Sequence, residues 1–277
     1  MYCIFMHMTH NYARTIVVKY GGGAMPASPA GQADPVLSEI AGLCAAGSEV
    51  VLVHGGGPEI DSALARRGVQ TLRIDGMRVT DAATLEVTEA VLCGSVNKRI
   101  VREALALGLA AVGLSGQDGK MLIAERAVGL RGEDLGHVGR IVSTDVRPLR
   151  ALLDAGFLPI VAPLGVAHGG SHAYNINADL AAAAFAAALR ADVFVAITNV
   201  ARVFRDPSDP GSGIDAFTPD DALRFAASEA CRSSMKPKIE GAACAVRDGA
   251  VAAYICSAKP NAIVSAIRGD ATVIRAA

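Results

Sequence analysis

The chain has 277 residues, of which 52% are hydrophobic, 19% charged and 4% aromatic, and its formal net charge is −1. This size and apolar content suit one large α/β domain or two lobes that share a sheet. The absence of Trp and of any basic field argues against a nucleic-acid partner. No apolar run approaches the roughly 18 residues of a membrane-spanning helix, so we expect no membrane partner.

Short β-branched runs alternate with helix-like stretches from residue 15 onward, which predicts a parallel sheet covered on both faces. The stretch 118–148 is a β-rich excursion, and 70–80 is a short segment without a clear pattern. The predicted strands are 15–20, 49–54, 110–114, 158–162, 192–198, 251–255 and 271–275. The predicted helices are 34–46, 58–67, 81–107, 146–155, 178–190, 219–227 and 236–248.

The cysteines carry no metal-binding or disulfide pattern. None forms a C-x-x-C pair, so we expect structural roles in a reducing, cytoplasmic compartment. Residues 1–8 are slightly apolar but lack the basic start and the cleavage site of a signal peptide. The six cysteines are Cys3, Cys44, Cys93, Cys231, Cys244 and Cys256.

Two glycine triplets, Gly21–Gly23 and Gly55–Gly57, each follow the end of a predicted strand. Glycines there let the backbone turn sharply and approach a ligand, and the exposed N–H groups of such a turn bind anions. Lys19 stands beside the first triplet, and Pro58 opens a helix after the second. The two turns together predict one site for a highly charged group, and hence phosphoryl transfer. We expect His54 to be a packed residue with no direct role.

Three further charged residues are candidates for the same site. The planar guanidinium of Arg78 suits a carboxylate. Asp179 falls in the first turn of a helix capped by Asn177, where it should stay ionised and could hold two lysines or orient a metal-bound water. Lys238 lies in the first turn of another helix and opposes its macrodipole, a local conflict typical of functional sites.

Each of these features taken alone also has an ordinary structural interpretation, as a solvated lysine, a helix cap or a surface arginine. The pattern G-x-x-x-x-G-K-[ST] is absent, which excludes a P-loop enzyme. The run Gly113-Leu114-Ser115-Gly116 matches neither a complete nucleophile elbow nor a dinucleotide fingerprint.

Seven segments, in order along the chain, resemble the acetylglutamate kinases of the amino-acid kinase superfamily. GMRVT and LGHVG point to the acetylglutamate branch in particular. The segments are VVKYGGGAM at 17–25, LVHGGGPEID at 52–61, DGMRVTD at 75–81, GLSGQDGKM at 113–121, LGHVG at 135–139, YNINAD at 174–179 and MKPKIEGA at 235–242.

The resemblance implies the amino-acid kinase fold, a three-layer αβα sandwich with a mainly parallel central sheet. Residues 1–175 would form an N-terminal lobe that binds the amino-acid substrate and dimerises, and 176–277 a nucleotide-binding lobe. The implied reaction moves a phosphoryl group from ATP to the γ-carboxylate of N-acetyl-L-glutamate, for arginine biosynthesis, with Mg²⁺ arriving on the ATP. The segment before the first strand is short, whereas arginine-inhibited hexamers carry a longer N-terminal helix, so a homodimer is expected.

The resemblance also implies roles for individual residues, with none assigned to a protein-held metal. Lys19 and Lys238 would stabilise the phosphoryl group, and Asp179 would organise the two lysines. Gly22 and Gly56 would donate backbone N–H groups to its oxygens. The substrate would be held by Gly56, Gly57, Arg78 and Asn175. The nucleotide and its phosphates would meet Gly21, Gly22, Thr198, Asn199 and Val200.

The chain departs from the family pattern at three places: Gly23 stands where the family usually has an Asn, the family's Gly near Arg202 is missing, and Ser233-Ser234 stand where a Gly pair is common. One alternative is a related carboxylate kinase that acts on carrier-protein-linked aminoadipate or glutamate, or a specialised-pathway paralogue, although the near-neutral charge offers no basic docking surface. The other is an inactive regulatory or binding protein of the same fold, against which the intact Lys19, Asp179 and Lys238 argue.

Overall fold

The computed structural model describes residues 15–25, 33–74, 76–170, 172–231 and 234–277. Cys3 and Ser233 of the sequence interpretation lie outside these residues. The other five cysteines form no disulfide among the described residues, and Cys256 is buried. Among the described residues, no helix combines the length and apolar character needed to cross a bilayer.

One sheet of eight described strands forms the centre of the molecule. Neighbouring strands are parallel except for one antiparallel pair, β13 and β14, so the predicted mainly parallel sheet is confirmed. In spatial order the strands are β12 (Ala216–Phe217), β14 (Thr272–Arg275), β13 (Ala252–Ser257), β11 (Val193–Thr198), β1 (Thr15–Tyr20), β2 (Glu49–His54), β8 (Leu158–Ala162) and β5 (Ala111–Ser115).

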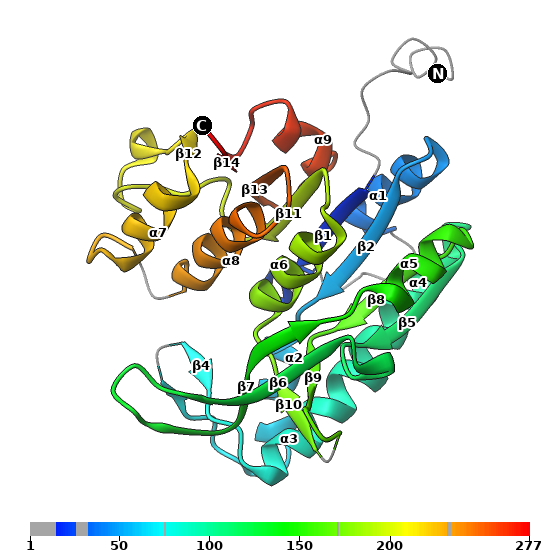
Figure 1. Cartoon of the computed structure of the whole chain (residues 1–277), viewed down its shortest axis with the longest axis vertical. Helices are drawn as coiled ribbons and strands as arrows, with labels where there is room; N and C mark the ends of the chain where they lie inside the picture. The colour runs from blue at the N-terminus through cyan, green and yellow to red at the C-terminus, as the bar shows by residue number, and fades with distance from the viewer. Residues whose placement is uncertain (1–14, 26–32, 75, 171, 232–233) are drawn as a thin grey trace.

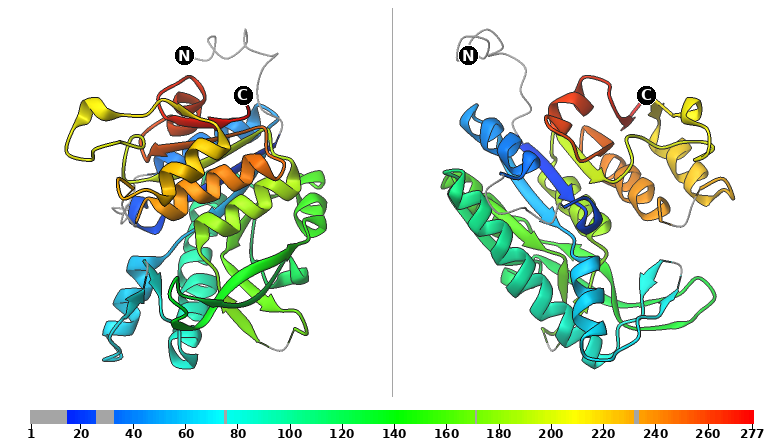
Figure 2. Two further views of the ribbon diagram at one scale, coloured as in Figure 1. Left: turned by 60° about the vertical axis from the view of Figure 1, so that its left-hand side comes forward. Right: turned by 180° about the vertical axis from the view of Figure 1, so that it is seen from behind.

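Helices cover both faces of this sheet (Figures 1 and 2). Side chains alternate across the central strand: Val17 of β1 packs in one hydrophobic cluster, whereas Ile16 and Val18 pack in another on the opposite face. The first cluster includes residues of α5 (Arg147–Asp154), α6 (Ala178–Leu189), α7 (Pro219–Ala227) and α8 (Lys236–Arg247). The second includes residues of α1 (Pro35–Ala45), α2 (Gly57–Ala65), α3 (Ala82–Glu89), α4 (Asn97–Ala106) and α9 (Ala262–Ile267). The predicted αβα layering is confirmed.

A smaller β-structure lies beyond the carboxyl ends of β2 and β8, at the lower end of Figure 1. Four strands close on one another there, two of them in the predicted β-rich stretch. The segment 70–80 contains a short hairpin, β3 (Arg73–Ile74) and β4 (Met77–Arg78). The four closed strands are β6 (Leu122–Val128), β7 (Asp134–Thr144), β9 (Leu164–Ala167) and β10 (Ala173–Asn175). The described residues also form the short 3₁₀ turns η2 (Gly22–Ala24), η4 (Asp118–Lys120) and η5 (Pro210–Ser212).

The prediction of one continuous helix over 81–107 is wrong in its middle. Between α3 and α4 the chain forms a π-helical segment, η3 (Ala90–Val96), in which the N–H of Asn97 donates to the Leu92 carbonyl five residues earlier. The wider turn changes which side chains after it face the sheet. Periodicity alone could not locate it, because the apolar pattern on either side of η3 is helical.

Candidate active site

The two glycine turns touch each other at the carboxyl edge of the sheet. Strands β1 and β2 are parallel neighbours with Tyr20 opposite His54, so their following turns meet, and Gly55 N–H donates to the Tyr20 carbonyl at 2.8 Å. A Cβ on Gly22 would lie 2.8 Å from the Gly56 nitrogen. A Cβ on Gly55 would lie 2.7 Å from the Gly22 nitrogen. This backbone-to-backbone approach requires glycine on both sides.

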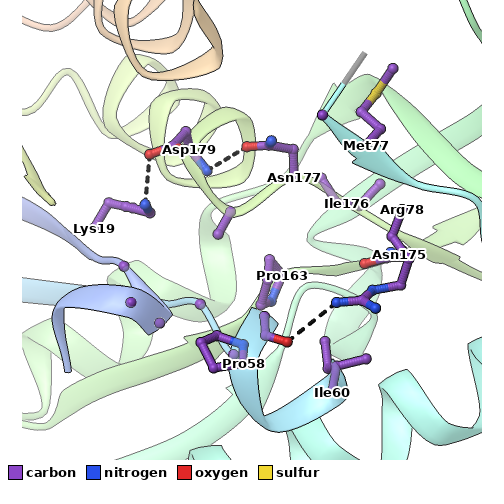
Figure 3. Close-up of a pocket in the computed structure, with 18 of the residues that line it drawn as sticks. Lys19, Pro58, Ile60, Met77, Arg78, Pro163, Asn175, Ile176, Asn177 and Asp179 are labelled. Carbon is purple, nitrogen blue, oxygen red and sulfur yellow. Dashed lines mark hydrogen bonds and ion pairs between the residues drawn. The ribbon is translucent and has the colours of Figure 1, made fainter. Parts of the chain in front are cut away.

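Two lysines from distant parts of the chain converge on one carboxylate, and Figure 3 shows the first of them, Lys19, beside Asp179. Lys19 Nζ, at the end of β1, lies 2.8 Å from Asp179 Oδ1. Lys238 Nζ, from the first turn of α8, lies 3.4 Å from Asp179 Oδ2. Asn177 caps α6, its side-chain oxygen accepting from Asp179 N–H at 2.8 Å, and so fixes the carboxylate in the first turn. The expected convergence of these three residues is therefore present.

Burial is the largest influence on the protonation of this cluster. It lowers the pKa of the Lys19 ammonium, with the Asp179 carboxylate opposing the shift. Burial alone would raise the pKa of Asp179, but the charges of Lys19 and Lys238 outweigh it and hold that pKa below its usual range. The Asp179 carboxyl is therefore ionised at neutral pH, and the two lysines exceed the one carboxylate, so the cluster suits an anionic ligand.

A cavity of about 350 Å³ runs from the lysine cluster, past both glycine turns, to Arg78. Lys19 and Asp179 lie at one end of it, and Arg78 and Asn175 at the other (Figure 3). All the predicted site residues except Val200 line this cavity. A second cavity of about 230 Å³ shares its Thr198, Asn199 and Lys238 lining with the first, and Val200 lines this second cavity.

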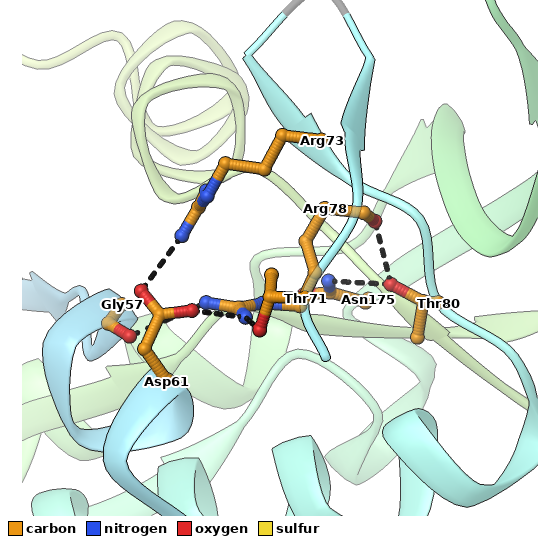
Figure 4. Close-up of polar contacts among 7 residues, drawn as sticks. All are labelled: Gly57, Asp61, Thr71, Arg73, Arg78, Thr80 and Asn175. Atoms are coloured by element: carbon orange, nitrogen blue, oxygen red, sulfur yellow. Dashed lines mark hydrogen bonds and ion pairs between the residues drawn. The ribbon is translucent and has the colours of Figure 1, made fainter. Parts of the chain in front are cut away.

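Arg78 is buried, and its guanidinium points into the end of the cavity opposite the lysines. Its Nη1 donates to Asp61 Oδ1 at 2.5 Å and to Thr71 Oγ1 at 3.1 Å, and its Nη2 donates to the Gly57 carbonyl at 3.3 Å (Figure 4). Asp61 also pairs with Arg73 at 2.9 Å. These contacts hold the guanidinium at this end of the cavity, and its planar set of donors suits a carboxylate.

Asn175 joins the same end of the cavity through a hydroxyl. Its Nδ2 donates to Thr80 Oγ1 at 3.1 Å, and Thr80 Oγ1 donates to the Arg78 carbonyl at 2.8 Å. Asn175 lies on β10 and Thr80 two residues after β4, so two distant segments are joined beside Arg78. The remaining side-chain oxygen of Asn175 has no partner among the contacts of the described residues and is available to a ligand.

Sequence reasoning missed four polar residues around Arg78. Asp61 is the last residue of LVHGGGPEID and lies one helical turn after Gly57, so the i,i+4 spacing on α2 could have placed it near the glycine turn. Thr80 is only two residues from Arg78 and donates to its carbonyl. Thr71 and Arg73 carry no local signal, because only the folding of the β3–β4 hairpin over α2 brings them close. The four missed residues are Asp61, Thr71, Arg73 and Thr80.

The departures from the family pattern lie at the edges of the site. A Cβ on Gly23 would meet nothing within 4 Å, so a larger residue would fit there. Arg202 lines the second cavity, but its guanidinium is held by Asp215 at 2.5 Å and by Asp270 at 3.7 Å. Its charge is thus neutralised locally. Ser234 lines the second cavity, and its carbonyl accepts from Lys238 Nζ at 3.1 Å.

The donor set of the main cavity suits phosphate oxygens better than a protein-held metal. Of the described residues that line it, Asp179 is the one carboxylate, and both its oxygens face ammonium groups. No group of three His, Cys, Asp or Glu residues within the described ranges is arranged to hold a metal. The described lining therefore offers positive charge and N–H donors rather than a set of metal ligands.

Comparison with known proteins finds relatives that match most of this chain. The acetylglutamate kinase of Rubrobacter xylanophilus is 43% identical over 256 residues, which are 92% of this chain and 94% of the relative. That of Methanopyrus kandleri is 41% identical over 243 residues, 87% of this chain and 96% of the relative. Both relatives match nearly end to end.

Solved structures share the fold. N-acetylglutamate synthase from Neisseria gonorrhoeae, complexed with coenzyme A and N-acetyl-glutamate, matches with a TM-score of 0.79 at 25% identity, over 95% of this chain and 60% of that chain. Carbamate kinase from Giardia lamblia bound to AMP-PNP matches with a TM-score of 0.67 at 18% identity, over 98% of this chain and 100% of that one, and shows the fold alone. The family model described as the amino acid kinase family covers residues 14–257, and the chain therefore belongs to the amino acid kinase family.

Proposed function

We propose that this chain transfers the γ-phosphoryl group of ATP to the γ-carboxylate of N-acetyl-L-glutamate, forming an acyl phosphate in arginine biosynthesis. The observation that carries the proposal is the single cavity with Arg78 at one end and Lys19, Asp179 and Lys238 at the other. Such a cavity suits a molecule with two carboxylates, one bound by the guanidinium and one presented to the phosphate. Relatives named acetylglutamate kinase, 36–43% identical, support the same substrate.

The proposed mechanism is positioning and electrostatic stabilisation. Arg78 binds the α-carboxylate, with Asn175 and Gly57 beside it, and directs the γ-carboxylate toward the glycine turns. That carboxylate is ionised near pH 7, so it attacks without a general base. Gly22 and Gly56 donate N–H groups to the equatorial oxygens of the moving phosphoryl group, and Lys19 and Lys238 offset its charge, held in place by Asp179.

We assign the nucleotide to the second cavity. Thr198 ends β11, and Asn199 and Val200 follow it. Thr198 and Asn199 line both cavities, which suits the phosphate chain, and Gly21 lies beside Lys19 on the phosphate path. The nucleotide substrate is then Mg²⁺-bound ATP, because the described lining of the second cavity contains no carboxylate that could bind the ion. Residues 1–175 would bind the amino acid and form a homodimer, and 176–277 would bind ATP, in the cytoplasm. Light scattering of the purified chain tests the dimer.

The function is tested by supplying ATP with N-acetyl-L-glutamate, glutamate, aspartate and N-acetyl-aminoadipate in turn. ADP release and trapping of the acyl phosphate with hydroxylamine are measured together. We expect both signals with N-acetyl-L-glutamate and much weaker ones with the other acceptors. Preference for another acceptor overturns the substrate assignment, and turnover with none of them supports an inactive binding protein.

Replacement of Lys238 tests the proposed chemistry. Lys238→Ala should lower kcat about 100-fold or more, because it removes one preorganised positive charge from the transition state. Lys236→Ala is the matched control: this lysine lies two residues away on the same helix, pairs with Glu240 at 3.9 Å and does not line the main cavity. Equal rates for the two variants would remove Lys238 from its proposed role.

A further inference from the structure

A buried polar pair, His54 and Asn97, lies beside the second glycine turn. His54 is 0% exposed and Asn97 1% exposed, and neither belongs to the described lining of the main cavity. His54 Nδ1 lies 2.8 Å from the Gly55 carbonyl oxygen, and its Nε2 lies 3.2 Å from Asn97 Nδ2. Both ring nitrogens thus have partners, one of them in the glycine turn itself.

The partners determine where the imidazole proton is. The Gly55 carbonyl can only accept a hydrogen bond, so Nδ1 carries the proton and donates it. Nε2 is then the acceptor, which suits the amide NH₂ of Asn97. Burial lowers the pKa of His54 to about 4, so the ring is neutral at pH 7 and carries a single N–H proton.

The orientation of Asn97 is fixed independently of His54. Its Nδ2 donates to the Ile160 carbonyl at 2.8 Å and faces the Leu114 carbonyl at 3.3 Å, while its Oδ1 accepts from Lys98 Nζ at 3.0 Å. A flipped amide would point its oxygen at two carbonyl oxygens. Any side chain on Gly113 would overlap Asn97 Oδ1, which gives a structural reason for the glycine in the otherwise unassigned Gly113–Gly116 run.

The hydrogen bond from His54 sets the direction of a neighbouring N–H. The Gly55 carbonyl and the Gly56 N–H belong to one planar trans peptide and point in opposite directions. With the carbonyl held by His54, the Gly56 N–H is directed away from the His54 ring. The Gly56 nitrogen lies 2.8 Å from the position of a Gly22 Cβ, so the two turns are in close contact here. Gly22 and Gly56 both line the cavity.

We infer that His54 is a positioning residue: held by Asn97 as the Nδ1–H tautomer, it fixes the Gly55–Gly56 peptide so that the Gly56 N–H faces the transferring phosphoryl group. The inference rests on the proposed function only in that it takes the transferred group to be a phosphoryl group. The position of the proton on His54 Nδ1 does not depend on the proposed function. His54 does not line the main cavity, so the role inferred for it is indirect.

The tautomer is measured on the unmodified protein by ¹⁵N NMR of labelled histidine at pH 7. The chain has six histidines, and the His54 signals are those missing from His54→Asn. We expect a neutral ring with the proton on Nδ1. A proton on Nε2 would overturn the inference, whether or not the chain phosphorylates N-acetyl-L-glutamate.

The consequence for turnover is measured with two amide variants. The amide of His54→Asn falls near Nδ1 and can still donate to the Gly55 carbonyl, whereas that of His54→Gln falls near Nε2 and cannot. We expect kcat of His54→Gln to be at least about tenfold below that of His54→Asn, with the KM for ATP and the thermal midpoints of the two variants similar. A purely structural role predicts equal kcat values, and that outcome would contradict the inference. Absence of turnover in the unmodified chain would instead reject the proposed function.

Discussion

Asp61 accepts a hydrogen bond from the guanidinium of Arg78, the group that we propose binds the α-carboxylate of the substrate. The substrate must share Arg78 with this aspartate or displace it, since Arg78 Nη1 donates to Asp61 Oδ1 at 2.5 Å. We expect Asp61→Asn to lower the KM for the amino-acid substrate several-fold, because a neutral amide competes less for the arginine. A raised KM in Asp61→Asn would show that Asp61 orients Arg78 rather than competing for it.

Arg78→Ala should raise the KM for the amino-acid substrate about 10- to 100-fold, since it removes a charge-assisted contact.

Titration of His54 predicts a loss of stability in acid. Its pKa is about 4 in the folded chain and near 6.5 when unfolded, so between these values the unfolded state binds more protons. The free energy of unfolding therefore falls as pH falls from 6.5 to 4, by about 3 kcal/mol from this residue. Urea unfolding of the unmodified chain and of His54→Asn at several pH values isolates it. A stability difference between them that stays constant from pH 7 to pH 4 would refute the buried neutral ring.

Residues with local signals could be predicted, and those with only tertiary signals could not. The positions of Lys19 and Asp179 follow from the ends of β1 and the start of α6, which the sequence marks with apolar runs and a cap. The convergence of Lys19 and Lys238 could be expected from the family resemblance alone, since no spacing rule joins residues so far apart. Arg73 and Thr71 had no signal, because their roles depend on how the β3–β4 hairpin folds.

The glycine turns make a prediction at the scale of the element. A methyl group on Gly22 would lie 2.8 Å from the Gly56 nitrogen and 3.0 Å from the Gly57 nitrogen, so Gly22→Ala must push the two turns apart. We expect kcat to fall about 100-fold or more, since both donor N–H groups move. Gly23→Ala is the control, because its methyl group would meet nothing within 4 Å. Similar losses in both variants would mean that helix η2, rather than the contact between turns, limits activity.

Elements built on continuous apolar runs were predicted close to their observed ends, as β1, β2 and β11 show. The helix α9 was missed because it is short and its N-terminus is completed from elsewhere. The Glu39 carboxylate of α1 accepts from Ile263 N–H at 3.1 Å and Val264 N–H at 2.8 Å, replacing a local cap. Strands β9 and β10 were missed for a similar reason: their partners β6 and β7 lie earlier in the chain, so pairing and not periodicity defines them.

At the scale of the whole molecule, the sheet crosses the predicted lobe boundary without a break. Strand β1 pairs with β2 on one side and with β11 on the other, so the central strand belongs to both halves. Helix α6, which follows residue 175, packs in the same hydrophobic cluster as Val17, Val51 and Val53. The lysine cluster lies across the same boundary. The division at 175 therefore describes proposed functions and does not mark two separate cores.

A fragment of residues 1–175 should consequently fail to fold alone. It would leave β1 without its β11 partner and would expose the apolar face of β1 and β2 that α6 covers. The full chain should unfold in urea in one transition, seen alike by far-UV circular dichroism and by tyrosine fluorescence, which is usable because the chain has no Trp. A fragment of residues 1–191 contains α6 but lacks β11, so it separates the contribution of the helix from that of the strand. A cooperative transition in the 1–175 fragment, or two separate transitions in the full chain, would show that the lobes are independent units and that the lysine cluster forms between them only after each has folded.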